Sequence, residues 1–143
     1  GTRTTAVRDG DQWVINGASW RLLKTAAAFA APGSLVYVTA LSGTAPTYTV
    51  NTTTTVDDPN VVAFGTASQV ALAQGDFFLG QTSGYGTAIS SAAIVAGAAI
   101  APSATAGRVV TATAATLSGV AGIALTAAGG AATVIGIRII HLN

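Results

Sequence analysis

Short hydrophobic runs separated by small and polar residues recur along the chain, and they predict β-strands rather than long helices. In the last third, apolar runs such as residues 98–101 alternate with Gly, Ser and Thr, and two longer runs follow at 119–125 and 132–140. Val, Ile and Thr are restricted at χ1 and suit a pleated strand, and the intervening Gly129-Gly130 pair would supply the positive φ of a tight turn. This segment therefore predicts a hairpin.

The beginning of the chain also has hairpin signals. Residues 4–8 and 12–15 are β-prone and flank residues 9–11, Asp-Gly-Asp, and an Asp-Gly pair in this position favours a tight turn. Asn16-Gly17 marks a second turn. We therefore expect residues 1–17 to form a hairpin or an extended arm.

Residues 19–40 are compatible with two structures. The Ala-rich part, 22–31, has the composition of a helix, but it has neither an acidic first turn nor a polar face. The alternative is a strand at 20–24, a turn at Pro32-Gly33 and a strand at 35–41. We favour the two strands.

Further elements follow from local composition. The Thr-rich run 47–55 predicts an exposed strand or arm, and 61–64 and 77–81 predict two more strands. Residues 66–73 are compatible with one short helix. Residues 83–86, Ser-Gly-Tyr-Gly, predict a turn.

These elements together predict an all-β protein with at most one or two short helices, built as a compact β-barrel or β-sandwich with an extended N-terminal arm or hairpin. The 143 residues suffice for one domain with a full core, and no linker divides them. We expect a single domain over 1–143, with 1–17 as the N-terminal hairpin or arm, 18–143 as the β core and 119–140 as its central hairpin.

Charge is unusually scarce. Only 8% of the residues are charged, against about a quarter in typical globular domains, and the acids are five aspartates. A free monomer usually needs more charge than this to avoid association, so we expect much of the surface to be buried against other subunits. The formal net charge of +1 comes without a basic stripe, which argues against a nucleic-acid partner.

The chain has no cysteine, which rules out disulfides and thiolate chemistry. Residues 25–41 and 87–107 are uncharged, but Pro, Gly and polar residues interrupt both, so we expect no membrane-spanning helix. The chain starts at Gly1 without a methionine, so we expect one or more residues to have been removed from the start or left out. No signal-peptide pattern opens the chain.

No group of residues predicts an enzyme, and we expect no catalytic, cofactor-binding or metal-binding residue. His141 is the single histidine, and no G-x-S-x-G elbow offers it a serine nucleophile. Asp9, Asp11, Asp57 and Asp58 lack the spacing of a calcium loop and occupy positions where turns favour Asp.

Three weaker patterns remain. Gly84-Tyr85-Gly86 lacks the third glycine of a dinucleotide-binding loop, and Asn51-Thr52-Thr53 matches a glycosylation acceptor without a secretory signal. The aromatic residues could form a sugar-binding platform, although such residues more often anchor a core or an interface. They are Trp13, Trp20, Tyr48, Phe77, Phe78 and Tyr85.

Several segments occur in a characteristic order: GDFFLGQ at 75–81 followed by Gly84-Tyr85, IVAGAAI at 94–100, SATAGRV at 103–109 and GVAGIALTAA at 119–128. This order resembles that of small head-decoration, or capsid-cement, proteins of tailed bacteriophages. Residues 20–24, WRLLK, with the later APGSLV at 31–36, are similar to the opening of such proteins.

The resemblance implies a non-enzymatic virion protein that binds the outer face of the capsid and stabilises it. Its partners would be the major capsid protein and further copies of itself, with a trimer favoured. It would bind neither nucleic acid nor a membrane. The protein would be in the host cytoplasm during assembly and on the capsid surface of the finished virion. The run 47–55 and the N-terminal arm are candidate contacts with neighbours. The alternatives are a phage tail or fibre component or another β-rich module that binds carbohydrate on a host surface, and, more distantly, a small hydrolase.

Overall fold

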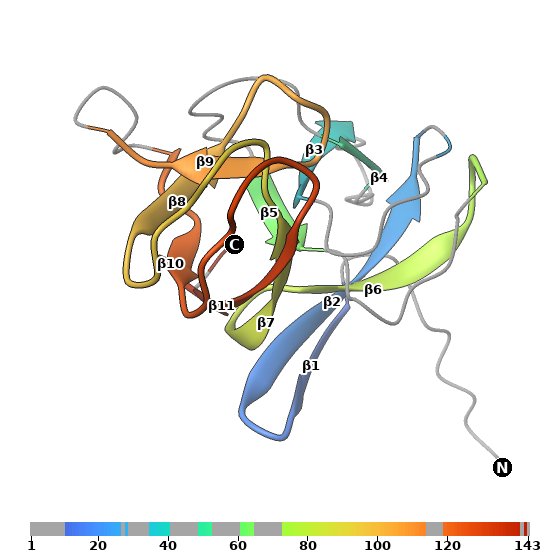
Figure 1. The fold of residues 1–143 in the computed structure, drawn as a ribbon. Coiled ribbons are helices and arrows are strands. Elements are labelled where there is room, and N and C mark those ends of the chain that lie inside the picture. Colours follow the sequence, from blue (N-terminus) through green and yellow to red (C-terminus); the bar gives the residue numbers. More distant parts are fainter. Residues whose placement is uncertain are drawn as a thin grey trace, which may run out of the picture.

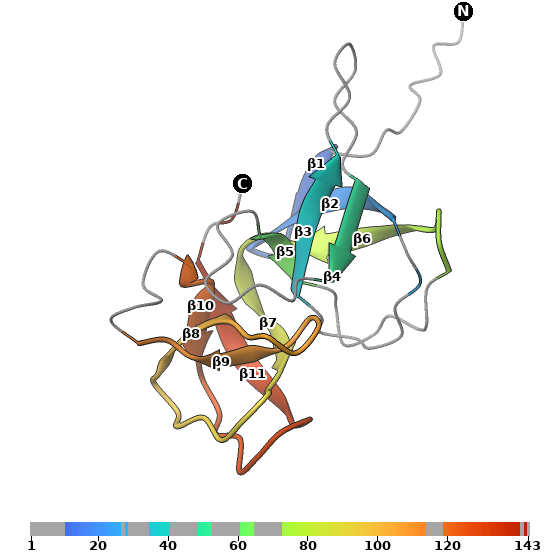
Figure 2. The same ribbon diagram turned by 90° about the horizontal axis from the view of Figure 1, so that it is seen from above.

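The computed structural model describes residues 11–26, 28, 35–40, 49–52, 61–64, 73–113, 119–140 and 142. The elements in these residues are strands, and they form two sheets that the views in Figures 1 and 2 show as two neighbouring groups. The strands of the first sheet lie within residues 12–81 and those of the second within residues 84–139.

The first sheet has six strands in the order β1-β2-β4-β3-β5-β6, and a further pairing joins the last strand, β6, to the second, β2. Most pairs are antiparallel, but β2 and β4 run parallel where Lys24 and Thr25 lie opposite Thr49 and Val50. The strands are β1 (Gln12–Ile15), β2 (Ala18–Thr25), β3 (Leu35–Ala40), β4 (Thr49–Thr52), β5 (Val61–Phe64) and β6 (Phe77–Gln81).

The second sheet has five strands in the order β7-β11-β10-β8-β9, all paired antiparallel. The hairpin partners β10 and β11 lie inside this sheet, flanked by β8 and β7. An isolated bridge between Ser90 and Val109 also links the end of β7 to β9. The strands are β7 (Gly84–Ile89), β8 (Ala99–Pro102), β9 (Val109–Thr111), β10 (Gly122–Ala124) and β11 (Val134–Ile139).

The core lies on the inner face of the second sheet. Along β11 the residues Ile135, Ile137 and Ile139 are buried while Val134 and Arg138 are exposed, as the two-residue period of a strand requires. Phe64 from β5 is fully buried in the same cluster and so connects the two sheets. Many members are small, which lets the backbones approach closely. The cluster also contains Ala88, Ile94, Ile100, Val109, Ala121, Ala124, Ala128 and Leu142.

Hydrogen bonds hold the chain where it passes from β6 to β7. The Thr82 amide donates to the Ser19 carbonyl at 2.8 Å, and the Leu142 amide donates to the Thr82 carbonyl at 2.8 Å. The buried Gln81 side chain donates from Nε2 to the carbonyls of Ser83 and Tyr85, at 3.0 and 2.7 Å. This connection is therefore tied to both the β1–β2 hairpin and the C-terminal end.

The prediction of an all-β protein is confirmed, and the arrangement in two sheets is sandwich-like. The strand interpretation of 19–40 is confirmed by β2 and β3, and the strands predicted at 61–64 and 77–81 are β5 and β6. Residues 1–10, the Pro32-Gly33 turn and residues 66–72 of the predicted helix lie outside the described residues. A search of the described part finds no helix with the length and hydrophobicity that crossing a membrane requires.

Two local predictions are wrong, and a third is confirmed only in part. Residues 83–86 do not form a turn, because β7 begins at Gly84 and pairs with β11. The strand predicted within 47–55 is confirmed as β4, Thr49–Thr52, but it is not an arm, because it lies between β2 and β3 with pairing on both sides. In the connection between β10 and β11, the positive φ falls on Ala132, at 59°, and not on Gly129-Gly130.

Candidate interaction surface

The structure places few of the polar candidates together. Asp9, Asp57, Asp58 and His141 lie outside the described residues, and Asp11 directly precedes β1. Within the described ranges, no group of three or more His, Asp or Glu side chains is arranged to hold a metal ion. Gly84-Tyr85-Gly86 belongs to β7, and Asn51 and Thr52 belong to β4. The polar candidates that the structure describes therefore define no site.

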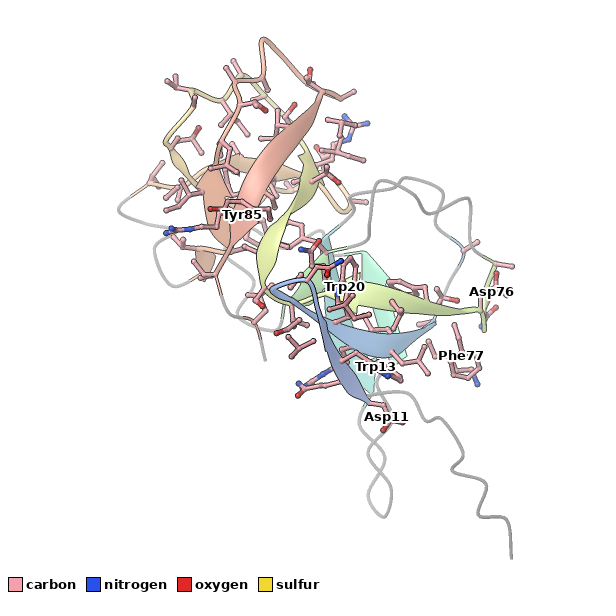
Figure 3. The ribbon with its side chains drawn as sticks, turned by 90° about the horizontal axis from the view of Figure 1, so that it is seen from below. Asp11, Trp13, Trp20, Asp76, Phe77 and Tyr85 are labelled. Carbon is pink, nitrogen blue, oxygen red and sulfur yellow. The ribbon has the colours of Figure 1, made fainter. Side chains whose placement is uncertain are left out.

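The aromatic candidates divide into separate groups (Figure 3). Trp13 of β1 lies directly opposite Trp20 of β2, and Phe77 of β6 lies opposite Lys24 of β2. Phe78, the next residue, points to the other side and is buried. Tyr85 lies on β7 in the second sheet, and Tyr48 is outside the described residues. The five described candidates therefore do not form a single platform, but three of them, Trp13, Trp20 and Phe77, share one face.

This face is the outer side of β1, β2 and β6. Directly opposed residues on antiparallel strands share a side, and so do residues two apart on one strand. Trp20, Leu22 and Lys24 therefore share the side of Trp13, Leu79 and Phe77, their cross-strand neighbours. We call this surface the aromatic face and define it by Trp13, Trp20, Leu22, Phe77 and Leu79.

The aromatic face is open to solvent mainly at Phe77 and Leu79. Phe77 is 56% exposed and Leu79 is 38% exposed, while Trp13, Trp20 and Leu22 are partly buried. At the tip of the β1–β2 hairpin, Ile15 continues the same side and is 49% exposed. Large apolar residues clustered on an exposed sheet face mark an interaction site more often than single exposed residues do.

The opposite side of the same strands is buried. Leu23 and Phe78 lie opposite each other and are 0% and 6% exposed. Thr25 Oγ1 donates to the Ala73 carbonyl at 2.6 Å, and Arg21 is also buried. The side that carries Leu23 and Phe78 is thus packed against the rest of the chain, whereas the aromatic face is only partly covered.

Charged groups lie at one end of the aromatic face. Lys24 Nζ lies 5.6 Å from the centre of the Phe77 ring, within the range of a cation–π contact. Asp76 directly precedes Phe77 and is exposed, and its Oδ2 accepts a hydrogen bond from the Ala73 amide at 2.8 Å. The apolar centre therefore has a polar rim that contains both signs of charge.

A smaller patch lies on the second sheet. Tyr85 is 73% exposed and lies opposite Arg138 of β11, which is also exposed. Ile123 of β10 lies on the other side of Arg138. Tyr and Arg are frequent in protein interfaces because each combines a large contact area with hydrogen-bonding groups.

Comparison with known proteins identifies a fold relationship. No protein-family model matches the chain, and no curated protein matches it. Among solved structures, the chain is similar to the crystal structure of the head fiber gp8.5 N base in bacteriophage phi29, with a TM-score of 0.57 and 13% sequence identity. The similarity covers 85% of this chain and 92% of that one. At this identity the match shows a shared fold.

Sequence reasoning found the aromatic members of the face but not Leu22 and Leu79. The period-two alternation in WRLLK and FFLGQ was the available signal, because it places Trp20, Leu22 and Lys24 on one side, and Phe77 and Leu79 likewise. The alternation could not show which side faces solvent, since both sides are apolar. The pairing of β2 with β6, more than 50 residues later, joins the two halves of the face.

Proposed function

We propose that this chain is a structural protein of a tailed-bacteriophage virion, attached to the outer surface of the head. In this role it is a non-enzymatic decoration protein that binds the assembled shell and stabilises it. The observation that carries the proposal is the similarity of fold to a phage head fiber base over 85% of this chain.

Two further properties support the proposal. The order of segments from Asp76 onward resembles that of head-decoration proteins, and this resemblance lies in the sequence and does not depend on the fold. The chain also carries charge on only 8% of its residues and exposes an apolar face on β1, β2 and β6, which suits a subunit held in an assembly.

The proposed partners are the major capsid protein and further copies of this chain, with a trimer favoured. The proposed location is the capsid surface, reached after synthesis in the host cytoplasm. Neither nucleic acid nor a membrane has a part in this function.

The alternative is a tail or fibre component that recognises carbohydrate on a host surface. Sugar-binding sites combine an aromatic ring with several polar groups placed beside it, because a sugar needs both stacking and hydrogen bonds. The aromatic face has Lys24 and Asp76 at one end only, and the Gln81 amide already donates to two carbonyls. We therefore favour attachment to protein over attachment to sugar.

The test is binding of the purified chain to expanded capsids from which it has been removed. We expect saturable binding at symmetric positions, seen in a low-resolution map of the particle, and a gain in resistance to heat or osmotic shock. Capsids that have not expanded serve as the control. If the chain ignores capsids but binds host cells or glycans, the proposal is wrong and the alternative is right.

A further inference from the structure

We propose that the aromatic face is the surface through which copies of this chain associate with one another. The occupant of the face is thus a second copy of the chain, which presents its own aromatic face or the rim beside it. This inference rests on the proposed function only in taking the chain to work as an assembled subunit. The inference adds to the proposed function the identity of the residues that make the contact.

The apolar composition of the face favours a permanent partner. Interfaces that form once and persist resemble a protein core, whereas contacts with a separately folded partner are about as polar as the general surface. Both tryptophans of the chain lie on this face, together with Phe77, Leu22 and Leu79. Trp is also among the residues that contribute most to binding energy in interfaces.

The size of the face fits the centre of an interface. Phe77 and Leu79, 56% and 38% exposed, give the face an apolar centre, and apolar patches of about 300–600 Å² on single subunits are often functional. A stable dimer of standard size buries about 800 Å² per partner, and its polar rim supplies the remainder. Ile15, 49% exposed at the hairpin tip, extends the apolar part.

The charges on the rim are compatible with self-association. Lys24 and Asp76 are both exposed and lie at the same end of the face (Asp76 labelled in Figure 3). A surface that carries one sign only would repel its own copy, but a rim with both signs lets the Lys24 of one copy meet the Asp76 of another. A second copy is therefore complementary in charge as well as in hydrophobicity.

The experiment compares three forms of the full chain by size-exclusion chromatography with light scattering over a range of concentrations. The test variant is Phe77→Ser with Leu79→Ser. The matched control is Val95→Ser with Val134→Ser, which removes side chains 75% and 53% exposed from the other half of the molecule. We expect the wild type to associate, the test variant to associate at least about 100-fold more weakly, and the control to match the wild type within about threefold.

Tryptophan fluorescence gives a second measurement on the same samples. Both tryptophans lie on the aromatic face, but Trp20 Nε1 is already buried in the single chain, so Trp13 is the main reporter. The emission should shift to shorter wavelength as the wild type associates on concentration, but not in the test variant. Circular dichroism confirms that each variant is folded. The variant Lys24→Glu tests the charge of the rim while keeping the five side chains of the aromatic face, although it removes the cation–π contact with Phe77. We expect it to weaken association more strongly at low salt than at high salt.

Several results would overturn the inference. One is a wild type that stays monomeric at every concentration, and another is a test variant that associates as tightly as the control. A third is a test variant that still associates but no longer binds capsids, which would assign the face to the shell and leave the proposed function intact. Conversely, association through this face without any capsid binding would reject the proposed function and keep the inference.

Discussion

Gly84 and Ala18 are in close contact where the β1–β2 hairpin meets the start of β7. A Cβ built on Gly84 would lie 3.0 Å from both Cα and Cβ of Ala18 and 3.3 Å from the Gly17 carbonyl oxygen. Gly84 also has a φ of 90°, which L-residues other than glycine rarely adopt. This glycine therefore allows the two sheets to approach each other at their connection.

The Gly84→Ala substitution should lower the free energy of unfolding by about 2–4 kcal/mol, from the unfavourable φ together with overpacking against Ala18. Gly97→Ala is the matched control, since Gly97 has a φ of 88° but nothing lies within 4 Å of its added Cβ. The control should lose only about 1–2 kcal/mol, the conformational part. Urea denaturation at one fixed protein concentration measures both, and equal losses would show that the Ala18 contact has no effect on stability.

The Gln81 side chain also stabilises the connection between β6 and β7. Its Nε2 donates to two carbonyls, and the residue is only 4% exposed. Gln81→Leu keeps the size of the side chain but leaves the Ser83 and Tyr85 carbonyls without this donor, so we expect a loss of about 2 kcal/mol in denaturation experiments. Gln74→Leu, at an exposed position, should change stability by less than about 0.5 kcal/mol. Similar effects at the two positions would contradict the assigned role of Gln81.

The connection between β10 and β11 contains a residue that glycine would suit better. Ala132 has a φ of 59°, so Ala132→Gly should relieve strain and raise stability by up to about 1 kcal/mol, despite the greater freedom of glycine in the unfolded chain. Ala131→Gly, next to it and without a positive φ, should lower stability by about 0.5–1 kcal/mol. Thermal unfolding of the pair checks the prediction, which requires shifts of opposite sign.

The turn at Ala132 also illustrates where sequence reasoning fails. Gly129-Gly130 is the stronger turn signal, since glycine adopts positive φ without strain, and it led to the prediction of the positive φ at that pair. The Ala132 amide instead donates to the Ser90 carbonyl at 2.8 Å, and the Ser90 hydroxyl donates to the Gly130 carbonyl at 2.7 Å. The backbone of this connection therefore makes hydrogen bonds with a residue about 40 positions away. The local sequence gives no sign of these contacts.

The sequence by itself determined the all-β class and the positions of several strands, including Val61–Phe64 and Phe77–Gln81, because β-branched and aromatic residues favour extended backbone locally. Only the tertiary structure decided which strands pair. It placed Thr49–Thr52 inside a sheet, Gly84–Ile89 in a strand and β6 beside β2. The aromatic face depends on that last pairing, which joins its two halves. The alternation along a strand defines two sides, and burial against distant residues decides which of them stays exposed.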